Sequence, residues 1–168
     1  MTDQPEFGQG NVLSAREHKF FTFFLGDELY GLDILKVREI IGMQEVTKVP
    51  GAEYYILGVI NLRGKVIPVA DLRLRFQFPA REHDGRTCIV VVEIAGEAGP
   101  VAMGLVVDAV DSVLNLKEEQ IEKAPVFSAR ISRDCIQGLG KVENKVIILL
   151  DIDLVCSLET VVEDGQES

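Results

Sequence analysis

The amino-acid sequence predicts a mainly β protein made of two small barrels. Short runs of β-branched and aliphatic residues recur with turn signals about every 8–12 residues, a rhythm typical of small barrels and sandwiches. The second half of the chain also loosely repeats the plan of the first: strands, a charged loop, a hairpin and a short capped helix. A chain of 168 residues is long enough for one domain or for two small barrels that share a core.

Roughly ten strands are expected from alternating apolar residues and flanking turn residues. In chain order they cover residues 19–25, 29–32, 37–41, 56–62, 66–70, 87–94, 101–107, 110–116, 136–142 and 146–150. Three aspartates are placed to begin short helices, because an aspartate side chain can accept a hydrogen bond from the first helical turn. They are Asp33 ahead of residues 34–36, Asp71 ahead of residues 72–76, and Asp151 ahead of a C-terminal helix running toward Leu158.

The segments between these elements define the expected domain organisation. Residues 1–17 are polar and rich in turn formers, which indicates a flexible N-terminal arm. Residues 45–53 and 117–133 are expected to be mostly loop. Proline, glycine and charge in residues 79–85 mark the best internal boundary. We therefore expect a folded domain over residues 18–157, with a first barrel region at about 18–80, a second at 86–157, and an acidic tail at 158–168.

The hairpin formed by residues 56–62 and 66–70 is the element around which the chain is organised. A helix through this stretch would contain Pro68, which alone costs about 3 kcal/mol in a helix interior. Pro68 lacks an N–H group and therefore suits an edge strand. Gly58, inside the first of the two strands, indicates a bulge or the close approach of another backbone. The turn carries Arg63, so a charged side chain and an edge strand are expected together, as suits a docking surface.

Charge and hydropathy exclude several function classes. The formal net charge of −10 and the pI near 4.7 disfavour binding to nucleic acid or to anionic lipid. No apolar run approaches the length of about 18 residues needed to cross a membrane, and the N-terminus lacks the features of a signal peptide. We therefore expect a cytoplasmic protein that does not insert into the membrane.

One region departs from the acidic average, because basic residues gather in it. They are Arg63, Lys65, Arg73, Arg75, Arg81 and Arg86. Two interpretations are open: a solvated face with a loop, or a basic patch that faces an acidic protein partner.

No constellation of residues predicts catalysis, a cofactor or a metal site. Cys88, Cys135 and Cys156 are odd in number and widely spaced, which favours small buried hydrophobic residues in a reducing compartment. His18 and His83 lie in polar surroundings with no nucleophile beside them. The glycines and lysine of the central turn do not match a phosphate-binding loop in spacing, and no calcium loop is present. The sequence therefore predicts a protein that is not an enzyme.

A binding surface remains as the expected source of function. Strict alternation along residues 37–41 would place Val37, Glu39 and Ile41 on one face of a strand. An apolar side chain beside a carboxylate could supply an anchor with a rim charge, which is common at interfaces. The alternative is that Val37 and Ile41 belong to the core and Glu39 is a solvated edge charge.

Four segments together carry a resemblance to a known family. They are FFLGDELYGLDI at 23–34, VREII at 37–41, GVINLRGKVIPVADL at 58–72, and GLG followed by VIILLD within 138–151. In this order and spacing they resemble the CheW family of bacterial chemotaxis coupling proteins, over about residues 19–156.

The resemblance implies two five-stranded SH3-like barrels packed side by side, between which strands can be shared. It implies a non-catalytic scaffold whose partners are the regulatory domain of the histidine kinase CheA and the cytoplasmic tips of chemoreceptors, with a groove between the barrels for the receptor's helical hairpin. The segments that match the family's contact regions include Val37, Glu39, Gly58 and Arg63, and we expect Glu39 and Arg63 to approach one another. Two alternatives stay open: an adaptor of a non-flagellar chemosensory pathway, and a small β-barrel ligand-binding protein.

Overall fold

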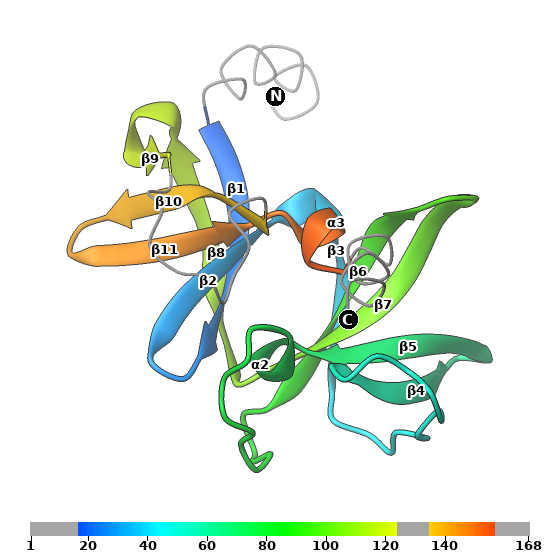
Figure 1. Cartoon of the computed structure of the whole chain (residues 1–168). Helices are drawn as coiled ribbons and strands as arrows, with labels where there is room; N and C mark the ends of the chain where they lie inside the picture. Colours follow the sequence, from blue (N-terminus) through cyan, green and yellow to red (C-terminus); the bar gives the residue numbers. More distant parts are fainter. Residues whose placement is uncertain (1–16, 124–134, 157–168) are drawn as a thin grey trace, which may run out of the picture.

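The computed structural model describes residues 17–123 and 135–156, which form two curled sheets with short helices between them (Figure 1). The six-stranded sheet has the order β8 (Ala109–Lys117), β1 (Glu17–Leu25), β2 (Glu28–Asp33), β11 (Lys145–Leu150), β10 (Ile136–Val142) and β9 (Ile121–Glu122). The five-stranded sheet has the order β3 (Val37–Gly42), β6 (Cys88–Gly96), β7 (Gly99–Val107), β5 (Lys65–Asp71) and β4 (Ile56–Leu62). The short helices are η1 (Ile34–Lys36), α2 (Leu72–Arg75), η2 (Glu118–Gln120) and α3 (Ile152–Val155). The predicted mainly β fold of two small barrels is confirmed.

The chain crosses between the barrels twice: strands β3 to β7 form the five-stranded barrel, and β1, β2 and β8 to β11 form the other. The hairpin β1–β2 belongs to the six-stranded barrel, but the chain then passes through η1 and β3 pairs with β6 in the other barrel. The hairpin β6–β7 belongs to the five-stranded barrel, and the chain then returns so that β8 pairs with β1. Each barrel is therefore built from both halves of the sequence, and two crossovers, at η1 and around Asp108, connect them.

The expected internal repeat is present as a hairpin–helix unit that occurs once in each barrel. The units are β4–β5–α2 and β10–β11–α3, and each hairpin pairs in parallel with a strand of the other hairpin in its barrel, β7 or β2. In both units an aspartate caps the helix: Asp71 accepts from the N–H of Arg73, and Asp151 accepts from the N–H of Asp153. The helix-capping predictions at these positions are confirmed.

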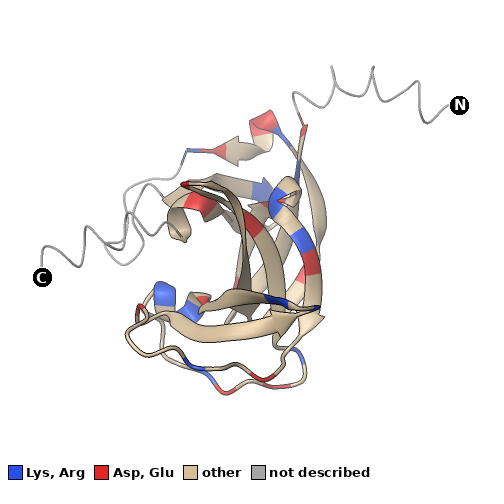
Figure 2. Cartoon of the chain, turned by 90° about the vertical axis from the view of Figure 1, so that its right-hand side faces the viewer, with Lys and Arg blue, Asp and Glu red and all other residues tan. Residues whose placement is uncertain are grey.

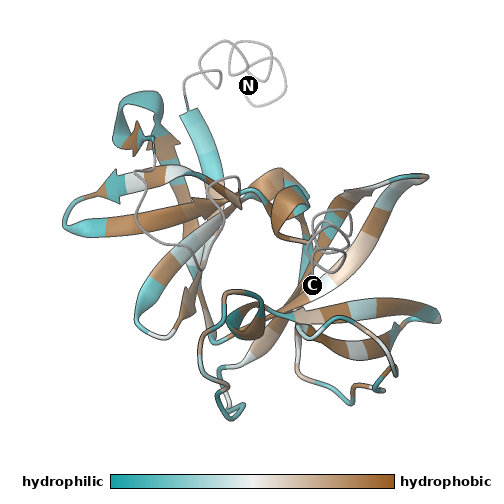
Figure 3. Cartoon of the chain, viewed as in Figure 1, coloured by the Kyte–Doolittle hydropathy of each residue, from teal (hydrophilic) through white to brown (hydrophobic). Residues whose placement is uncertain are grey.

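Three apolar clusters fill the molecule, and the largest joins the barrels. It contains Phe23 and Tyr30 of the six-stranded barrel together with Val90 and Leu105 of the other. Phe76, which follows α2, stacks on Tyr30 with ring centroids 6.0 Å apart. A smaller cluster lies inside each barrel, and the strands are accordingly apolar along most of their length (Figure 3). The shared cluster means that the two barrels fold around one common core.

Two sequence predictions about individual elements are wrong. Pro68 does not lie on an edge strand, because β5 is paired on both sides. The proline is tolerated because the pairing with β7 begins only at Val69, so no partner on that side needs its missing N–H. Residues 117–133 are not mostly loop in their first part: β8 extends to Lys117, and η2 and β9 follow, with Ile121 opposite Gly140 on β10.

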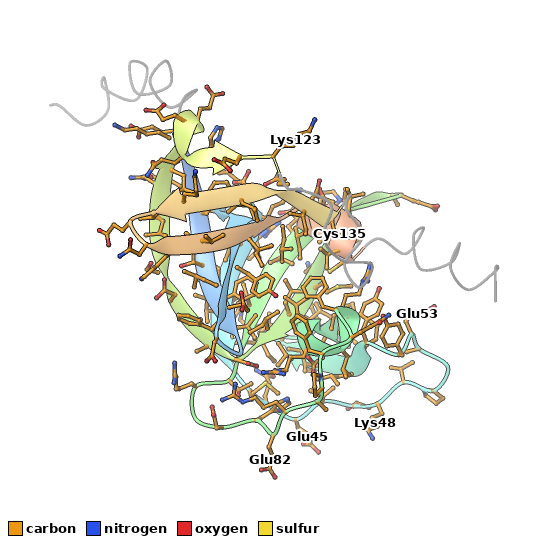
Figure 4. All side chains as sticks on the ribbon, turned by 60° about the vertical axis from the view of Figure 1, so that its left-hand side comes forward. Glu45, Lys48, Glu53, Glu82, Lys123 and Cys135 are labelled. Carbon is orange, nitrogen blue, oxygen red and sulfur yellow. The ribbon has the colours of Figure 1, made fainter. Side chains whose placement is uncertain are left out.

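Residues 1–16 of the expected N-terminal arm, the acidic tail and the end of the C-terminal helix at Leu158 lie outside the described residues. Glu17, which the prediction assigned to the arm, is the first residue of β1. Cys135 and Lys123 are the described residues on either side of the internal gap; Cys135 lies beside α3 while Lys123 points outward (Figure 4). Within residues 17–123 and 135–156, no helix has the length and apolar character to cross a membrane.

Candidate partner-binding surface

Glu39 and Arg63 form an ion pair on the surface of the five-stranded barrel. Arg63 occupies the left-handed region at φ 52° in the turn between β4 and β5, where Asn61 Oδ1 accepts the N–H of Gly64 at 2.8 Å. Arg63 Nη2 donates to Glu39 Oε2 on β3. The arginine side chain is 69% exposed and that of the glutamate 31%. The predicted approach of these two residues is therefore present, and both charges remain accessible to a partner.

Gly58 sets the path of β4, the strand that leads into the turn carrying Arg63. It lies at a bulge in β4, with φ at 151°, and an added Cβ atom would stand 2.1 Å from the carbonyl oxygen of Thr47. The missing side chain lets the segment before β4 approach, so that Thr47 and Val59 exchange backbone hydrogen bonds of 2.9 and 2.8 Å. Both readings of the glycine, a bulge and a close backbone approach, are confirmed. Gly58 itself is buried, so its contribution is to the path of the chain.

Val37 does not share a face with Glu39, contrary to the sequence prediction. A bulge at Arg38 shifts the register between β3 and β6, so that Val37 pairs with Val92 while Glu39 pairs with Val91. Neighbouring residues of β6 point to opposite faces. Val37 is half-buried and packs against the core shared by the barrels, whereas Ile41 packs against the cluster inside the five-stranded barrel. The bulge, rather than strict alternation, decides which side chains meet.

Ile40 is the exposed apolar residue of β3, and the sequence interpretation did not select it. Its side chain is 46% exposed, next to Glu39 in the chain and two residues from Arg38, which pairs with Glu93. An isoleucine next to a charged residue on an edge strand was the available signal, but alternation alone assigned the anchor to Val37. The structure brings Glu39 and Arg63 together, whereas Ile40 points to the opposite face of the same edge strand. We call these three residues, which lie along the β3 edge of the sheet and in the β4–β5 turn, the β3 patch.

The proposed basic patch between residues 63 and 86 does not exist as such. Arg73 is nearly buried and bonds to Asp108, and Arg81 bonds to the same carboxylate. Arg75 donates to the carbonyl oxygen of Val155 and stands over the ring of Tyr55. Figure 2 shows basic and acidic residues interspersed on this side of the molecule. Folding therefore brings distant carboxylates and carbonyl oxygens to Arg63, Arg73, Arg75 and Arg81, which form bonds within the chain.

The chain's long β3–β4 connection surrounds the lower side of the five-stranded barrel. Its charged residues Glu45, Lys48 and Glu53 point away from the body of the protein (Figure 4). All three side chains are exposed, in agreement with the expectation that residues 45–53 form a loop.

The described residues contain no group of three His, Cys, Asp or Glu side chains that could hold a metal ion. His18 and His83 are both exposed. His18 borders a groove of about 530 Å³ whose apolar lining includes Phe20 and Ile34. This groove lies on the six-stranded barrel beside η1, and the groove expected between the barrels stays a prediction.

Burial raises the pKa of three groups that do not form a common site. It raises the pKa of Tyr30, of Tyr55 and of Cys156 each to about 12. Cys135 and Cys156 are buried in the shared core, as expected of small apolar side chains, and Cys88 is half-buried. The hydroxyl oxygen of Tyr55 is buried and has no hydrogen-bond partner among the described residues.

Comparisons with known proteins agree with this architecture. A family model described as "CheW-like domain" matches residues 19–159. The chain is 40% identical over 141 residues to the chemotaxis protein CheW of Klebsiella aerogenes, covering 84% of this chain and 82% of that protein. It is 33% identical over 142 residues to the chemotaxis protein CheW of Bacillus subtilis, covering 84% and 88%. Among solved structures, the scaffolding protein TtCheW from Thermoanaerobacter tengcongensis superposes with a TM-score of 0.75 at 38% identity, covering 84% of this chain and 93% of that one.

Proposed function

Because the chain belongs to the CheW family, we propose that it is a non-catalytic scaffold that couples chemoreceptors to the histidine kinase CheA in bacterial chemotaxis. The observation that carries this proposal is the family match over residues 19–159, which includes every described element from β1 to α3. The partners are the regulatory domain of CheA and the cytoplasmic tips of the receptors. The protein then acts in the cytoplasm, recruited to receptor arrays at the membrane.

The β3 patch supplies features that a partner of this kind needs. Ile40 offers an exposed apolar side chain, and apolar anchors near the centre of an interface carry much of its binding energy. Glu39 and Arg63 neutralise one another, so burying the pair against a partner would not leave one charge uncompensated. Such a pair fixes orientation and partner choice more than it raises affinity. Val37, at the start of β3, packs against the shared core, and Gly58 sets the path of β4.

Reconstitution of the signalling complex tests the proposal. Receptor-containing membranes and CheA are combined with and without the protein, and autophosphorylation of the kinase is measured. We expect strong activation that is lost with Arg63→Ala in a protein that remains folded by circular dichroism. Lys141→Ala is the matched control, because Lys141 is also an exposed cation in an ion pair, with Glu122, but lies on the other barrel.

The negative result has a definite meaning. If the protein fails to activate the kinase together with its cognate receptor, the coupling role is rejected, and an adaptor for a different kinase in a non-flagellar pathway becomes the better hypothesis. If Arg63→Ala and Lys141→Ala have the same effect, the coupling role stands but the β3 patch is not its site.

A further inference from the structure

Each of the two crossovers between the barrels is held by an aspartate that links elements of both barrels. The first carboxylate is that of Asp108, where the chain passes from β7 to β8. It accepts the N–H of Gly26, in the β1–β2 turn of the six-stranded barrel, at 2.6 Å. It also accepts hydrogen bonds from Arg73, on α2 of the five-stranded barrel: Nη2 donates at 2.9 Å and Nε at 3.1 Å. Arg81 adds a further bond at 3.0 Å.

The second carboxylate is that of Asp153, on α3 beyond the six-stranded barrel. It accepts a hydrogen bond from the Nζ atom of Lys36, on the crossover η1, at 2.7 Å. Its other oxygen accepts the N–H of Ala95, near the tip of the β6–β7 hairpin in the five-stranded barrel, at 2.9 Å. A helix, a crossover and the hairpin of the opposite barrel are thus joined by one aspartate, as they are at Asp108.

The two arrangements occupy equivalent places in the repeated architecture. Arg73 and Asp153 are both the second residue of the helix that follows the repeated hairpin. The bulges of β8 and β3 are also equivalent: Thr22 pairs with Ser112 and Phe23 with Val110, as Val91 pairs with Glu39 and Val92 with Val37. Only the polarity is reversed, because the helix supplies the cation in the first arrangement and the anion in the second. The same junction is therefore bridged twice by different residues.

We propose that Asp108 and Asp153 are positioning residues whose two ion-pair clamps set the orientation of one barrel relative to the other. Apolar burial in the shared core is non-directional, so it holds the barrels together without fixing their angle. Charge-assisted hydrogen bonds from arginine are directional, especially when two nitrogens of one guanidinium donate to one carboxylate. Each clamp also captures a backbone N–H of the facing hairpin, which ties the clamp to the sheet itself.

The two clamps differ in burial, and this difference predicts unequal contributions. The side chains of Arg73 and Asp108 are 15% and 13% exposed, whereas those of Lys36 and Asp153 are 36% and 31% exposed. Interactions between charges are weakened by solvent. The Asp108 clamp is therefore the stronger constraint on the angle.

Residual dipolar couplings of backbone amides test this proposal, because they report the orientation of each barrel separately. In the unaltered protein, the couplings of both barrels fit one alignment tensor. In the double variant Asp108→Asn with Asp153→Asn, we expect the couplings to fit well within each barrel but to require different tensors for the two. Asp108→Asn alone produces most of this loss of common alignment. The fit within each barrel shows directly whether that barrel remains folded.

Glu122→Gln is the matched control, because it removes the Lys141–Glu122 ion pair within a single barrel; one tensor should still fit. A double variant whose barrels keep one tensor in the original orientation would overturn the proposal. The measurement needs no partner, so its result is independent of the proposed coupling role. Where that role holds, the double variant should also lose kinase activation, since partners that contact both barrels require a fixed angle.

Discussion

Arg63 reaches from the β4–β5 turn to Glu39 on β3 and so joins the two opposite ends of the five-stranded sheet. β3 and β4 are the terminal strands of that sheet, and β3 arrives from the other barrel through η1. The ion pair therefore connects the two terminal strands of the sheet through side chains. It also lies on the surface, so a partner that docks there would contact both charges.

Exchanging the charges of Glu39 and Arg63 shows whether partner binding requires their ion pair or only a charge at each position. Glu39→Arg and Arg63→Glu should each reduce partner binding, because each leaves two like charges side by side. The double variant restores the pair in reverse and should recover binding to the kinase or receptor, measured by titration calorimetry. The free energy of unfolding should change by only about 0–1 kcal/mol, as is usual for exposed ion pairs.

A double variant that binds as poorly as the worse single variant would show that the partner reads the individual charges. In that case Glu39 and Arg63 contact the partner directly, and their mutual contact is incidental to recognition.

Gly58→Ala should destabilise the protein by roughly 1–3 kcal/mol, the range for strained backbone positions. The added Cβ would meet the Thr47 carbonyl oxygen at a distance that no structure tolerates, at a backbone angle that favours glycine. Urea unfolding measures the loss, and amide hydrogen exchange should show that the Val59 N–H, bonded to Thr47, is deprotected first.

Gly42→Ala is the control for this change. Gly42 ends β3, and an added Cβ there meets nothing within 4 Å. Its unfolding midpoint should stay close to that of the unaltered protein. Equal losses in the two variants would mean that the clash with Thr47 is not the cause.

Ile40→Ser should weaken partner binding by about tenfold or more, because truncation of a side chain that anchors an interface costs about 2 kcal/mol or more. Stability should change by less than about 0.5 kcal/mol, since the side chain is largely exposed. Val146→Ser is the matched control, as Val146 is a similarly exposed aliphatic residue on the other barrel. Unchanged binding in Ile40→Ser, measured by the same calorimetric titration, would remove Ile40 from the β3 patch.

Local rules predicted the elements whose form depends on neighbouring residues in the chain. The hairpins, the capping aspartates and the special role of Gly58 all follow from the chemistry of short stretches. Asp71 caps α2 because its carboxylate is two residues from the N–H that it accepts. The turn containing Arg63 forms because Gly64 and Asn61 stabilise it. The fold class followed from these elements and their spacing.

Features that depend on distant parts of the chain could not be predicted in this way. The bulge at Arg38 arises from pairing with β6, more than fifty residues later in the printed sequence, and it separates Val37 from Glu39. The partners of Arg73 and Arg81 are equally remote, so a cluster of cations in the sequence became a set of internal bonds. The crossing of the chain between the barrels likewise depends on which edges meet in space.

Cys156 should resist thiol reagents in the folded protein. Burial raises the pKa of its thiol to about 12, and the thiolate is the reactive species. Cys88 is half-buried, so it should be modified first. Time-resolved labelling with peptide mass spectrometry distinguishes the two, and Cys156 should react only at the rate of unfolding. Modification of Cys156 as fast as Cys88 under native conditions would show that this part of the shared core opens readily.

Asp108 and Asp153 should make the free energy of unfolding decrease at acidic pH. Burial would raise the pKa of each carboxyl, but hydrogen bonds from Arg73 and Gly26, and from Lys36 and Ala95, outweigh it and hold the pKa below the ordinary value of 3.8. The unfolded chain therefore binds protons more readily than the folded one, so this stability is fully present well above pH 3.8 and is lost as the pH falls through the folded-state pKa. Asp71 acts in the opposite direction, because burial raises its pKa.

The test compares urea unfolding at about pH 7 and about pH 3, on either side of the ordinary aspartate pKa. At the higher pH, Asp108→Asn should lower the free energy of unfolding by roughly 2–3 kcal/mol, the worth of hydrogen bonds to a charged group. At the lower pH its difference from the unaltered protein should shrink, because Asp108 is then partly protonated in both states of the unaltered chain. A deficit that stays constant between the two pH values would mean that the loss comes from altered packing, and that the charge of Asp108 does not stabilise the junction between the barrels.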